Sequence, residues 1–324
     1  MRVSSEVQRG LLQTIQHSSF PTLTLQIPSP NKSDDGLRSS LSYEDPDGDL
    51  IVPRKKSNVR RKRPNRNALV TTTNLMHLRV AASSDVDECG TQLWRGALLL
   101  SELLLDNNKL IEDVSVLEVG CGIGLVAIIA SRYSRIFFAT DNDLETLKLT
   151  QHNIDRNVHG RIRVRHLDWT DLTPVERNGI FGWTSDELTA FQSASVILAR
   201  STLQFLKFLY GRFNKSEFLV MYLTVEKRVV FAIDTMSSIS LGYDVFQQSI
   251  CSHPNIRTKT VGKSHQYQCS ACDRNQRYFV ASPIPVISIP QVFQYVRMTT
   301  LELWRVDGII VNENESIVDK KSAV

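Results

Sequence analysis

The fold is decided by the segment Val116-Leu117-Glu118-Val119-Gly120-Cys121-Gly122-Ile123-Gly124-Leu125. Its first half belongs to an apolar run that is interrupted only by Glu118, which predicts a fully buried strand of a parallel sheet. Its second half carries three alternating glycines and leads into an apolar helix. Glycine allows a sharp turn, and it lets a ligand lie against the backbone because no Cβ stands between them. The segment therefore predicts a ligand-binding loop, although tight turns also use glycine.

The spacing of these glycines bears on the kind of ligand. The pattern is G-x-G-x-G, whereas dinucleotide-binding folds use G-x-G-x-x-G, whose third glycine admits a pyrophosphate at the start of the helix. A carboxylate on the preceding strand, Glu118, would also repel a phosphate. Both features count against a nucleotide-linked oxidoreductase.

Outward from this segment, short apolar runs alternate with helical periods, which is typical of an α/β fold with a mostly parallel sheet. We predict helices on both faces of the sheet, over about 93–107, 124–133, Leu144–Asn157, 203–213 and 229–250. The predicted strands number seven, and they are Val114–Val119, Ile136–Thr140, Ile162–His166, Ser195–Ala199, Phe218–Val225, Tyr278–Ala281 and Leu301–Val306.

Asp141 is the second feature that indicates a ligand. It ends the second predicted strand 21 residues after Gly120, close to the offset at which Rossmann-type folds place an acid on ribose hydroxyls. A carboxylate there can accept two hydrogen bonds from a vicinal diol. The alternative interpretation is that Asp141, or Asp143, caps the helix that begins at Leu144.

A carboxylate and an aromatic side chain follow the third predicted strand. Asp168 and Trp169 stand directly after it, and the indole face would suit an adenine ring. The alternative is that Asp168 caps a loop while Trp169 belongs to the core.

Taken together, these residues resemble the class I methyltransferases that bind S-adenosylmethionine, and within them the family of lysine-directed methyltransferase-like proteins. The similarity covers about Gln92–Val306, two thirds of the chain. Four further motifs carry it, and they are Gln92-Leu93-Trp94-Arg95-Gly96-Ala97, Leu167-Asp168-Trp169, Val225-Glu226-Lys227-Arg228 and Leu301-Glu302-Leu303-Trp304.

The resemblance implies a seven-stranded Rossmann-like methyltransferase sheet and transfer of the S-adenosylmethionine methyl group to a lysine side chain of a protein substrate. It places Trp94 near the methionine end of the cofactor, Asp141 at the ribose and Trp169 at the adenine. The full set of implied cofactor-binding residues is Trp94, Glu118, Gly120, Cys121, Gly122, Gly124, Asp141, Asp168, Trp169 and Ala199.

The chain departs from the family after the fourth strand, where an acid-x-x-aromatic motif is expected to face the target amine. Arg200 occupies the acid position, no Tyr or Phe stands at the expected distance, and the link from Ala199 to Phe218 is short. A cation there would repel a cationic amine and a sulfonium. The catalytic residues are therefore not predicted, and the alternative function is a catalytically impaired methyltransferase-like binding protein.

Four residues near the end of the chain suggest a metal site. Cys269 and Cys272 have the C-x-x-C spacing of half a zinc site, and Cys251 and His253 would complete four ligands. A second C-x-x-C is missing. The alternative is therefore a polar loop with reduced cysteines and no metal.

The first 84 residues form a region of different character. Residues 1–84 are rich in Ser, Pro, Asp and Arg, which predicts a mostly disordered tail before a methyltransferase domain over 85–310 and a second tail over 311–324. The alternating stretch Phe20–Ile27 reads as a strand that docks on the domain.

The basic residues concentrate in one run. Arg54–Arg66 carries eight basic residues and no acidic one, and subtracting them from the net +4 leaves −4 for the rest of the chain. The run, part of the stretch 53–66, resembles a nuclear import signal, the alternative being a solvated tail. The absence of aromatic residues in the run and the acidic remainder argue against direct nucleic-acid binding.

Composition also indicates the compartment. Five cysteines do not resemble a secreted disulfide framework, and neither a signal peptide nor about 18 consecutive apolar residues are found. We expect a protein of the nucleus and cytoplasm without a membrane segment.

Overall fold

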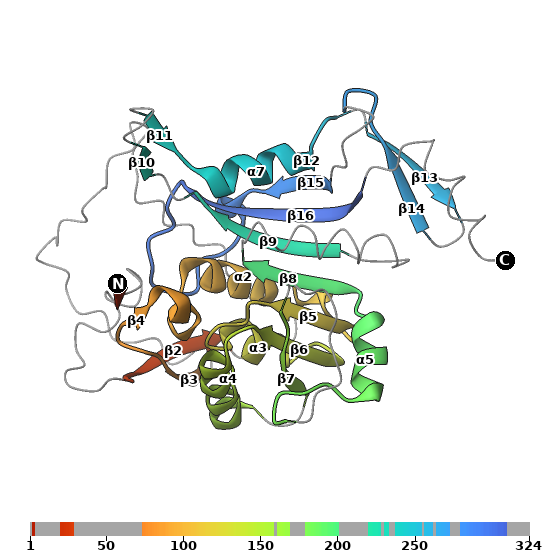
Figure 1. Cartoon of the computed structure of the whole chain (residues 1–324). Coiled ribbons are helices and arrows are strands. Elements are labelled where there is room, and N and C mark those ends of the chain that lie inside the picture. The colour runs from red at the N-terminus through yellow and green to blue at the C-terminus, as the bar shows by residue number, and fades with distance from the viewer. Residues whose placement is uncertain are drawn as a thin grey trace, which may run out of the picture.

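The computed structural model describes residues 2–3, 20–28, 73–158, 161–168, 179–200, 220–227, 230–232, 237–254, 256–261, 264–272 and 279–309. Its centre is an eight-stranded sheet (Figure 1). In spatial order the strands are β12 (Ile250–Cys251), β15 (Phe279–Ile284), β16 (Leu301–Ile309), β9 (Val220–Glu226), β8 (Val196–Arg200), β5 (Ser115–Val119), β6 (Ile136–Asp141) and β7 (Ile162–His166).

The sheet contains all seven predicted strands, and the two-residue strand β12 is an additional edge strand. Strand β5 pairs in parallel with β6 and β8, and β8 pairs in parallel with β9. The last strand in sequence, β16, inserts antiparallel between β9 and β15. Dinucleotide-binding folds have the strand order 3-2-1-4-5-6 and lack this reversed insertion.

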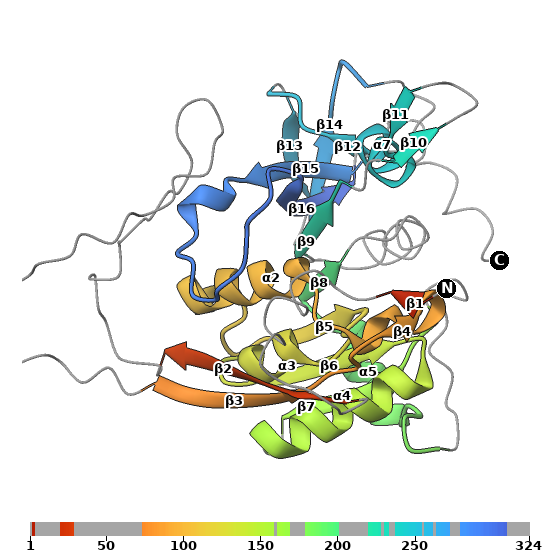
Figure 2. The same cartoon turned by 90° about the vertical axis from the view of Figure 1, so that its left-hand side faces the viewer.

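Helices cover both faces of the sheet, as predicted (Figure 2). One core joins α2 (Arg95–Asp106), α3 (Leu125–Ala130) and α4 (Leu144–Asn157) to one face, through residues such as Leu98, Val126 and Leu147. A second core joins α5 (Ser185–Gln192) and α7 (Leu241–Ser249) to the other face, where Phe191 and Phe246 are buried. Of the helices that the structure describes, none has the length and apolar character needed to cross a membrane.

The ordered body begins earlier in the sequence than residue 85. Strand β2 (Thr22–Pro28) pairs antiparallel with β3 (Thr73–Arg79), and every second residue of β2 is buried, which confirms the strand predicted over 20–27. Strand β3 packs with the body, where Met76 and Leu78 are fully buried, although it precedes the predicted boundary at 84/85. Residues 29–72, the larger part of the predicted disordered tail, lie outside the described residues, as does the C-terminal tail 311–324.

Several short elements complete this part of the chain. Strand β1 (Arg2–Val3) pairs with β4 (Ser84–Asp85), and the 3-10 helix η1 (Val86–Thr91) leads to α2. Two further 3-10 turns are η2 (Asn108–Leu110) and η3 (Val286–Ser288).

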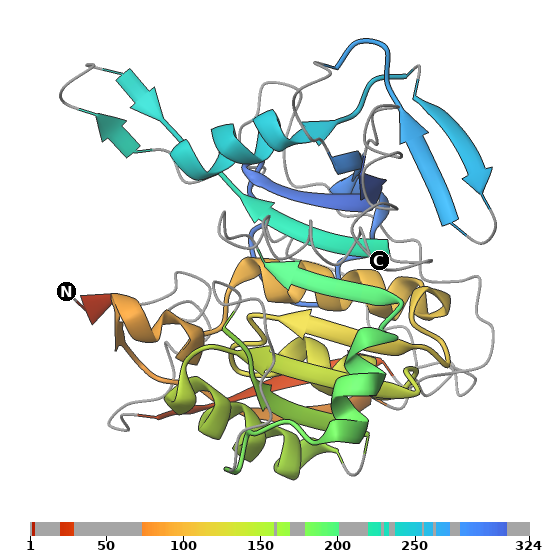
Figure 3. The ribbon, with the colours of Figure 1, turned by 45° about the vertical axis from the view of Figure 1, so that its right-hand side comes forward.

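The prediction of one helix over 229–250 is wrong in its first half. Strands β10 (Val230–Ala232) and β11 (Ser237–Ile239) form a hairpin there, and only α7 is helical. Valine and phenylalanine favour strands, and their apolar run hides the change of period. A second hairpin, β13 (Arg257–Val261) with β14 (Ser264–Gln268), stands where a polar loop was expected. Figure 3 shows the two hairpins at opposite ends of the upper part of the molecule. The helix predicted over 203–213 lies outside the described residues.

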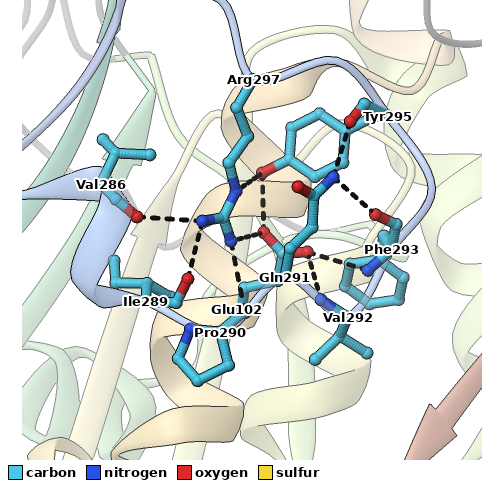
Figure 4. A network of polar contacts seen from close by, with 9 residues as sticks. All are labelled: Glu102, Val286, Ile289, Pro290, Gln291, Val292, Phe293, Tyr295 and Arg297. Carbon is cyan, nitrogen blue, oxygen red and sulfur yellow. Dashed lines mark hydrogen bonds and ion pairs between the residues drawn. The ribbon is translucent and has the colours of Figure 1, made fainter. Parts of the chain in front are cut away.

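A buried ionic network fixes the segment that connects β15 to β16 (Figure 4). The carboxylate of Glu102, on α2, is fully buried and accepts hydrogen bonds from the backbone N–H groups of Val292 and Phe293 at 2.8 and 2.9 Å. It also accepts from the Tyr295 hydroxyl at 2.7 Å and pairs with the Arg297 guanidinium at 2.7 Å. Burial and the Glu102 charge raise the pKa of Tyr295, so its hydroxyl stays a donor. The network therefore fastens the loop before β16 onto α2.

Candidate active site

The glycine loop lies where β5 ends and α3 begins. Gly120 and Gly122 have φ of +71° and +54°, in the left-handed region that side chains other than glycine rarely adopt. A Cβ at Gly120 would meet no atom within 4 Å, so the backbone at this residue faces open space. The Cys121 N–H donates to the Thr140 carbonyl at 2.8 Å, which fastens the loop to the end of β6.

Asp141 closes over this loop from the end of β6. Its side chain is 7% exposed, and its Oδ2 accepts from the Gly122 N–H at 3.0 Å while Oδ1 accepts from the Asn142 N–H at 2.9 Å. The role of helix cap belongs to Asp143, which accepts from the N–H groups of Glu145 and Thr146 at the start of α4. The structure thus assigns capping to Asp143 and leaves Asp141 beside the loop, where a ribose-binding acid is expected.

Side chains of helix α4 donate hydrogen bonds to carbonyl groups of the glycine loop, and these residues were not predicted from the sequence. The Thr150 hydroxyl donates to the Gly122 carbonyl, and the Asn153 amide donates to the Ile123 carbonyl at 2.9 Å. Asn153 also pairs with both the N–H and the carbonyl of Arg79 in β3, at 2.7 and 2.9 Å.

Asn157, one helical turn further along α4, repeats this contact on β3. Its amide pairs with the N–H and the carbonyl of His77 at 2.9 and 2.8 Å. The two asparagines therefore satisfy the free edge of β3 as a neighbouring strand would, and they connect the hairpin β2–β3 to the glycine loop.

Two other elements reach the same edge of the sheet. Trp94 precedes α2, and its indole N–H donates to the Cys89 carbonyl at 2.8 Å. Arg95 forms an ion pair at 2.9 Å with Glu226, the last residue of β9. The pair connects the start of α2 to the carboxyl end of β9. In the sequence, the one signal for these two residues is that each belongs to a motif of the resemblance, Arg95 to the first and Glu226 to the third. Ala199, at the carboxyl end of β8, is buried.

A polar cluster lies beside the end of β9. The Lys227 amine stands 3.9 Å from the centre of the Tyr243 ring and 3.7 Å from the Glu302 carboxylate. The Tyr243 hydroxyl and the Trp304 indole donate to the same carboxylate at 2.9 and 2.8 Å. The Tyr243 hydroxyl and the Glu302 charge raise the pKa of Lys227, so this amine is held in its charged form.

The remaining predicted residues are placed as follows. Glu118 is buried on β5, directly before the loop, and Gly124, with φ of +84°, precedes α3. Asp168 is half-buried. It lies near Asp141, since the N–H of the preceding residue, Leu167, donates to the Asp141 carbonyl at 3.0 Å. Trp169 lies outside the described residues, as does the segment 201–219 that follows Arg200.

The sheet with its reversed last strand, together with a glycine loop and an acid at the ends of adjacent strands, defines a class I methyltransferase. A family model described as lysine methyltransferase matches residues 74–180. Over these residues the chain is similar to the lysine methyltransferase family.

Several named proteins are similar to this chain over longer stretches. Methyltransferase-like protein 22 of Mus musculus is 27% identical over 326 residues, which cover 89% of this chain and 78% of that protein. The protein of the same name from Homo sapiens is 28% identical, over 72% of this chain and 57% of its own length. The protein-lysine methyltransferase METTL21E of Bos taurus is 28% identical, over 62% of this chain and 69% of its own length.

Proposed function

We propose that this chain is a protein-lysine N-methyltransferase that transfers the methyl group of S-adenosyl-L-methionine to a lysine side chain of another protein. The observation that carries this proposal is the contact between Asp141 and the Gly122 N–H, which joins the acid after the second strand to the glycine loop. It is supported by the match of residues 74–180 to the lysine methyltransferase family.

The residues at the loop fit this cofactor. The backbone at Gly120 faces space that a Cβ would occupy, so a ligand can lie directly against it. Asp141 would accept from the ribose hydroxyls, and Trp94 would lie near the methionine part. Bound there, S-adenosyl-L-methionine supplies an electrophilic methyl group on a sulfonium. Glu118 and Asp141 are both buried near the loop. Their carboxylates give the site a negative charge, which attracts a cationic sulfonium.

The chain itself has to position a neutral amine in line with the methyl group and to exclude water. A charged ammonium lacks the free electron pair that attacks carbon, so a lysine held in its charged form does not react. Lys227 is such a lysine, because Tyr243 and Glu302 raise its pKa. We therefore do not assign Lys227 as the acceptor, and the match to the lysine methyltransferase family supports a lysine of another protein in that role.

Methyl transfer to protein is tested directly with the purified full chain. Incubation with S-adenosyl-L-methionine labelled in the methyl group and a cell extract lacking this protein should label a protein, and hydrolysis should release the label as methyl-lysine. Gly120→Val is the inactive control, because a β-branched residue does not adopt the φ of +71° and its side chain would enter the open space.

The same experiment separates enzyme from binding protein. Calorimetric binding of S-adenosyl-L-methionine without any transfer of label would overturn the proposed activity and favour the cofactor-binding module instead. Absence of binding would overturn both.

We further propose that the run Arg54–Arg66 is recognised by a nuclear import receptor, and that the protein is shared between nucleus and cytoplasm. The support is compositional: eight basic residues, no acidic residue and no aromatic residue for stacking on bases. The run lies outside the described residues.

A fluorescent fusion of the full chain tests this localisation. Replacing Arg60, Arg61, Lys62 and Arg63 with glutamine should lower the nuclear fraction severalfold. The matched control replaces Lys320 and Lys321, a basic pair outside the run, and should leave the distribution unchanged. An unaltered nuclear fraction in the first variant would contradict the proposal.

A further inference from the structure

Four potential metal ligands lie close together at the edge of the sheet that is remote from the glycine loop. The Nδ1 atom of His253 lies 3.1 Å from the Sγ of Cys251, 3.5 Å from the Sγ of Cys269 and 3.7 Å from the Sγ of Cys272. The four ligand atoms all lie within 4.8 Å of one another, and the three cysteines form no disulfide. We propose that these residues bind a structural zinc ion with a Cys3His ligand set.

The distances match tetrahedral coordination. Zinc lies about 2.3 Å from a thiolate sulfur and about 2.0–2.1 Å from an imidazole nitrogen, so a tetrahedron requires about 3.6 Å between sulfur and nitrogen. The three observed Sγ to Nδ1 distances surround this value. The sulfur-to-nitrogen distances therefore fit a tetrahedral zinc site, and all four ligand atoms lie within 4.8 Å of one another.

The ligands come from segments that are separate in the sequence. Cys251 is buried in the edge strand β12, where it pairs with Val280, and His253 follows two residues later. Cys269 stands directly after β14, and Cys272 lies in the turn beyond it. One ion would thus join the edge of the central sheet to the base of the hairpin β13–β14.

The position of the cluster indicates a structural rather than a catalytic ion. Cys251 is level with the beginning of β15, whereas the glycine loop lies at the carboxyl ends of β5 and β6, five strands away in the sheet order. Ligands of α/β sheets bind at the carboxyl ends of the strands. Four protein ligands also complete a tetrahedron, so no position is left for a substrate.

Where the structure describes side chains around this hairpin, they form one small apolar cluster. The small core around it is centred on Cys251 and Val280, with Ile256 and Tyr267 packed against it. The Tyr267 ring lies on Gly308 of β16 so closely that a Cβ there would be 2.7 Å from the ring. Binding energy of a metal becomes folding energy when the ligands are brought together only in the folded state. The ion would add to the stability that this core supplies.

Binding zinc through three thiolates releases three protons and uses a neutral imidazole, so the experiment keeps the thiols reduced at neutral pH. The full chain, purified under reducing conditions and dialysed, should carry about one zinc ion per chain by elemental analysis. Replacement by Co²⁺ should produce thiolate-to-cobalt charge transfer and the visible absorption of a tetrahedral site.

Variants make the proposal specific. Cys272→Ser should lose the zinc, whereas Cys89→Ser, at an exposed cysteine outside the cluster, should retain it. His253→Cys should also retain about one zinc per chain and alter the cobalt spectrum towards four sulfur ligands. This variant keeps the test decisive if Cys272→Ser fails to fold. A folded, reduced chain that takes up no zinc or cobalt, or a disulfide among the three cysteines, would overturn the proposal without affecting the methyltransferase assignment.

Discussion

Asp141→Ala should reduce the affinity for S-adenosyl-L-methionine by about 100-fold or more, because hydrogen bonds to a charged acceptor contribute about 1.5–3 kcal/mol each and 1.4 kcal/mol is a factor of ten. The change removes the carboxylate that we propose as the acceptor for the ribose hydroxyls. It also removes the partner of the Gly122 N–H, which holds the loop in its left-handed conformation. Isothermal calorimetry on the full chain measures the loss.

The matched control for this prediction is Asp143→Ala. Asp143 lies two residues away and caps α4, so its loss should cost about 1 kcal/mol of stability. Affinity for the cofactor should stay close to that of the unaltered chain, because Asp143 faces the helix and not the loop. Equal loss of affinity in both variants would show that Asp141 acts only through the helix, and the assignment of Asp141 to the ribose would be wrong.

Glu102→Gln should lower the free energy of unfolding by about 3–5 kcal/mol, the range found when one partner of a buried ion pair is removed. The replacement keeps the size of the side chain but leaves the Arg297 guanidinium, 14% exposed, without its counter-charge. It also weakens the acceptor for Val292 and Phe293. Denaturant unfolding measures the effect.

Glu145→Gln is the control for this prediction. Glu145 pairs with Lys148 on the surface of α4, where both side chains are 62% exposed, and such pairs contribute about 0–1 kcal/mol. The double variant Glu102→Gln with Arg297→Gln should recover part of the loss, because no uncompensated charge remains. If Glu102→Gln costs no more than Glu145→Gln, the network does not anchor the loop before β16.

The central sheet could be predicted because each of its strands is a short apolar run between turn residues. Strand β7, Ile162–His166, was predicted to the residue, and α4 begins at the predicted Leu144 and ends at Asn157, where its end was predicted approximately. The prediction failed where two structures share one apolar pattern, as in 229–250, and where the stabilising contacts are non-local. Helix α5 was missed although its capping box, Thr184 with Glu187, is a local signal.

In the candidate site, too, local signals could be predicted and non-local contacts could not. The glycines and Asp141 were predictable because backbone turns and strand ends impose local residue choices. The choice between Asp141 and Asp143 as the cap required coordinates, since both precede α4. Asn153 and Asn157 have the spacing of one helical turn, but nothing in the sequence indicates that they contact β3, more than 70 residues away. The zinc ligands could be suggested by spacing, yet only the fold brings Cys251 and His253 to the C-x-x-C pair.

The insertion of β16 has a consequence for how the protein is made. Strands β9 and β15 share no ladder, and each has β16 as its neighbour in the sheet. During synthesis the N-terminal half of the sheet therefore emerges with β9 as an open edge, and this edge is closed only when residues 301–309 leave the ribosome. Unpaired edges of this kind attract other chains. A nascent chain stalled before Leu301 is thus the species most exposed to aggregation and the one that a chaperone would bind.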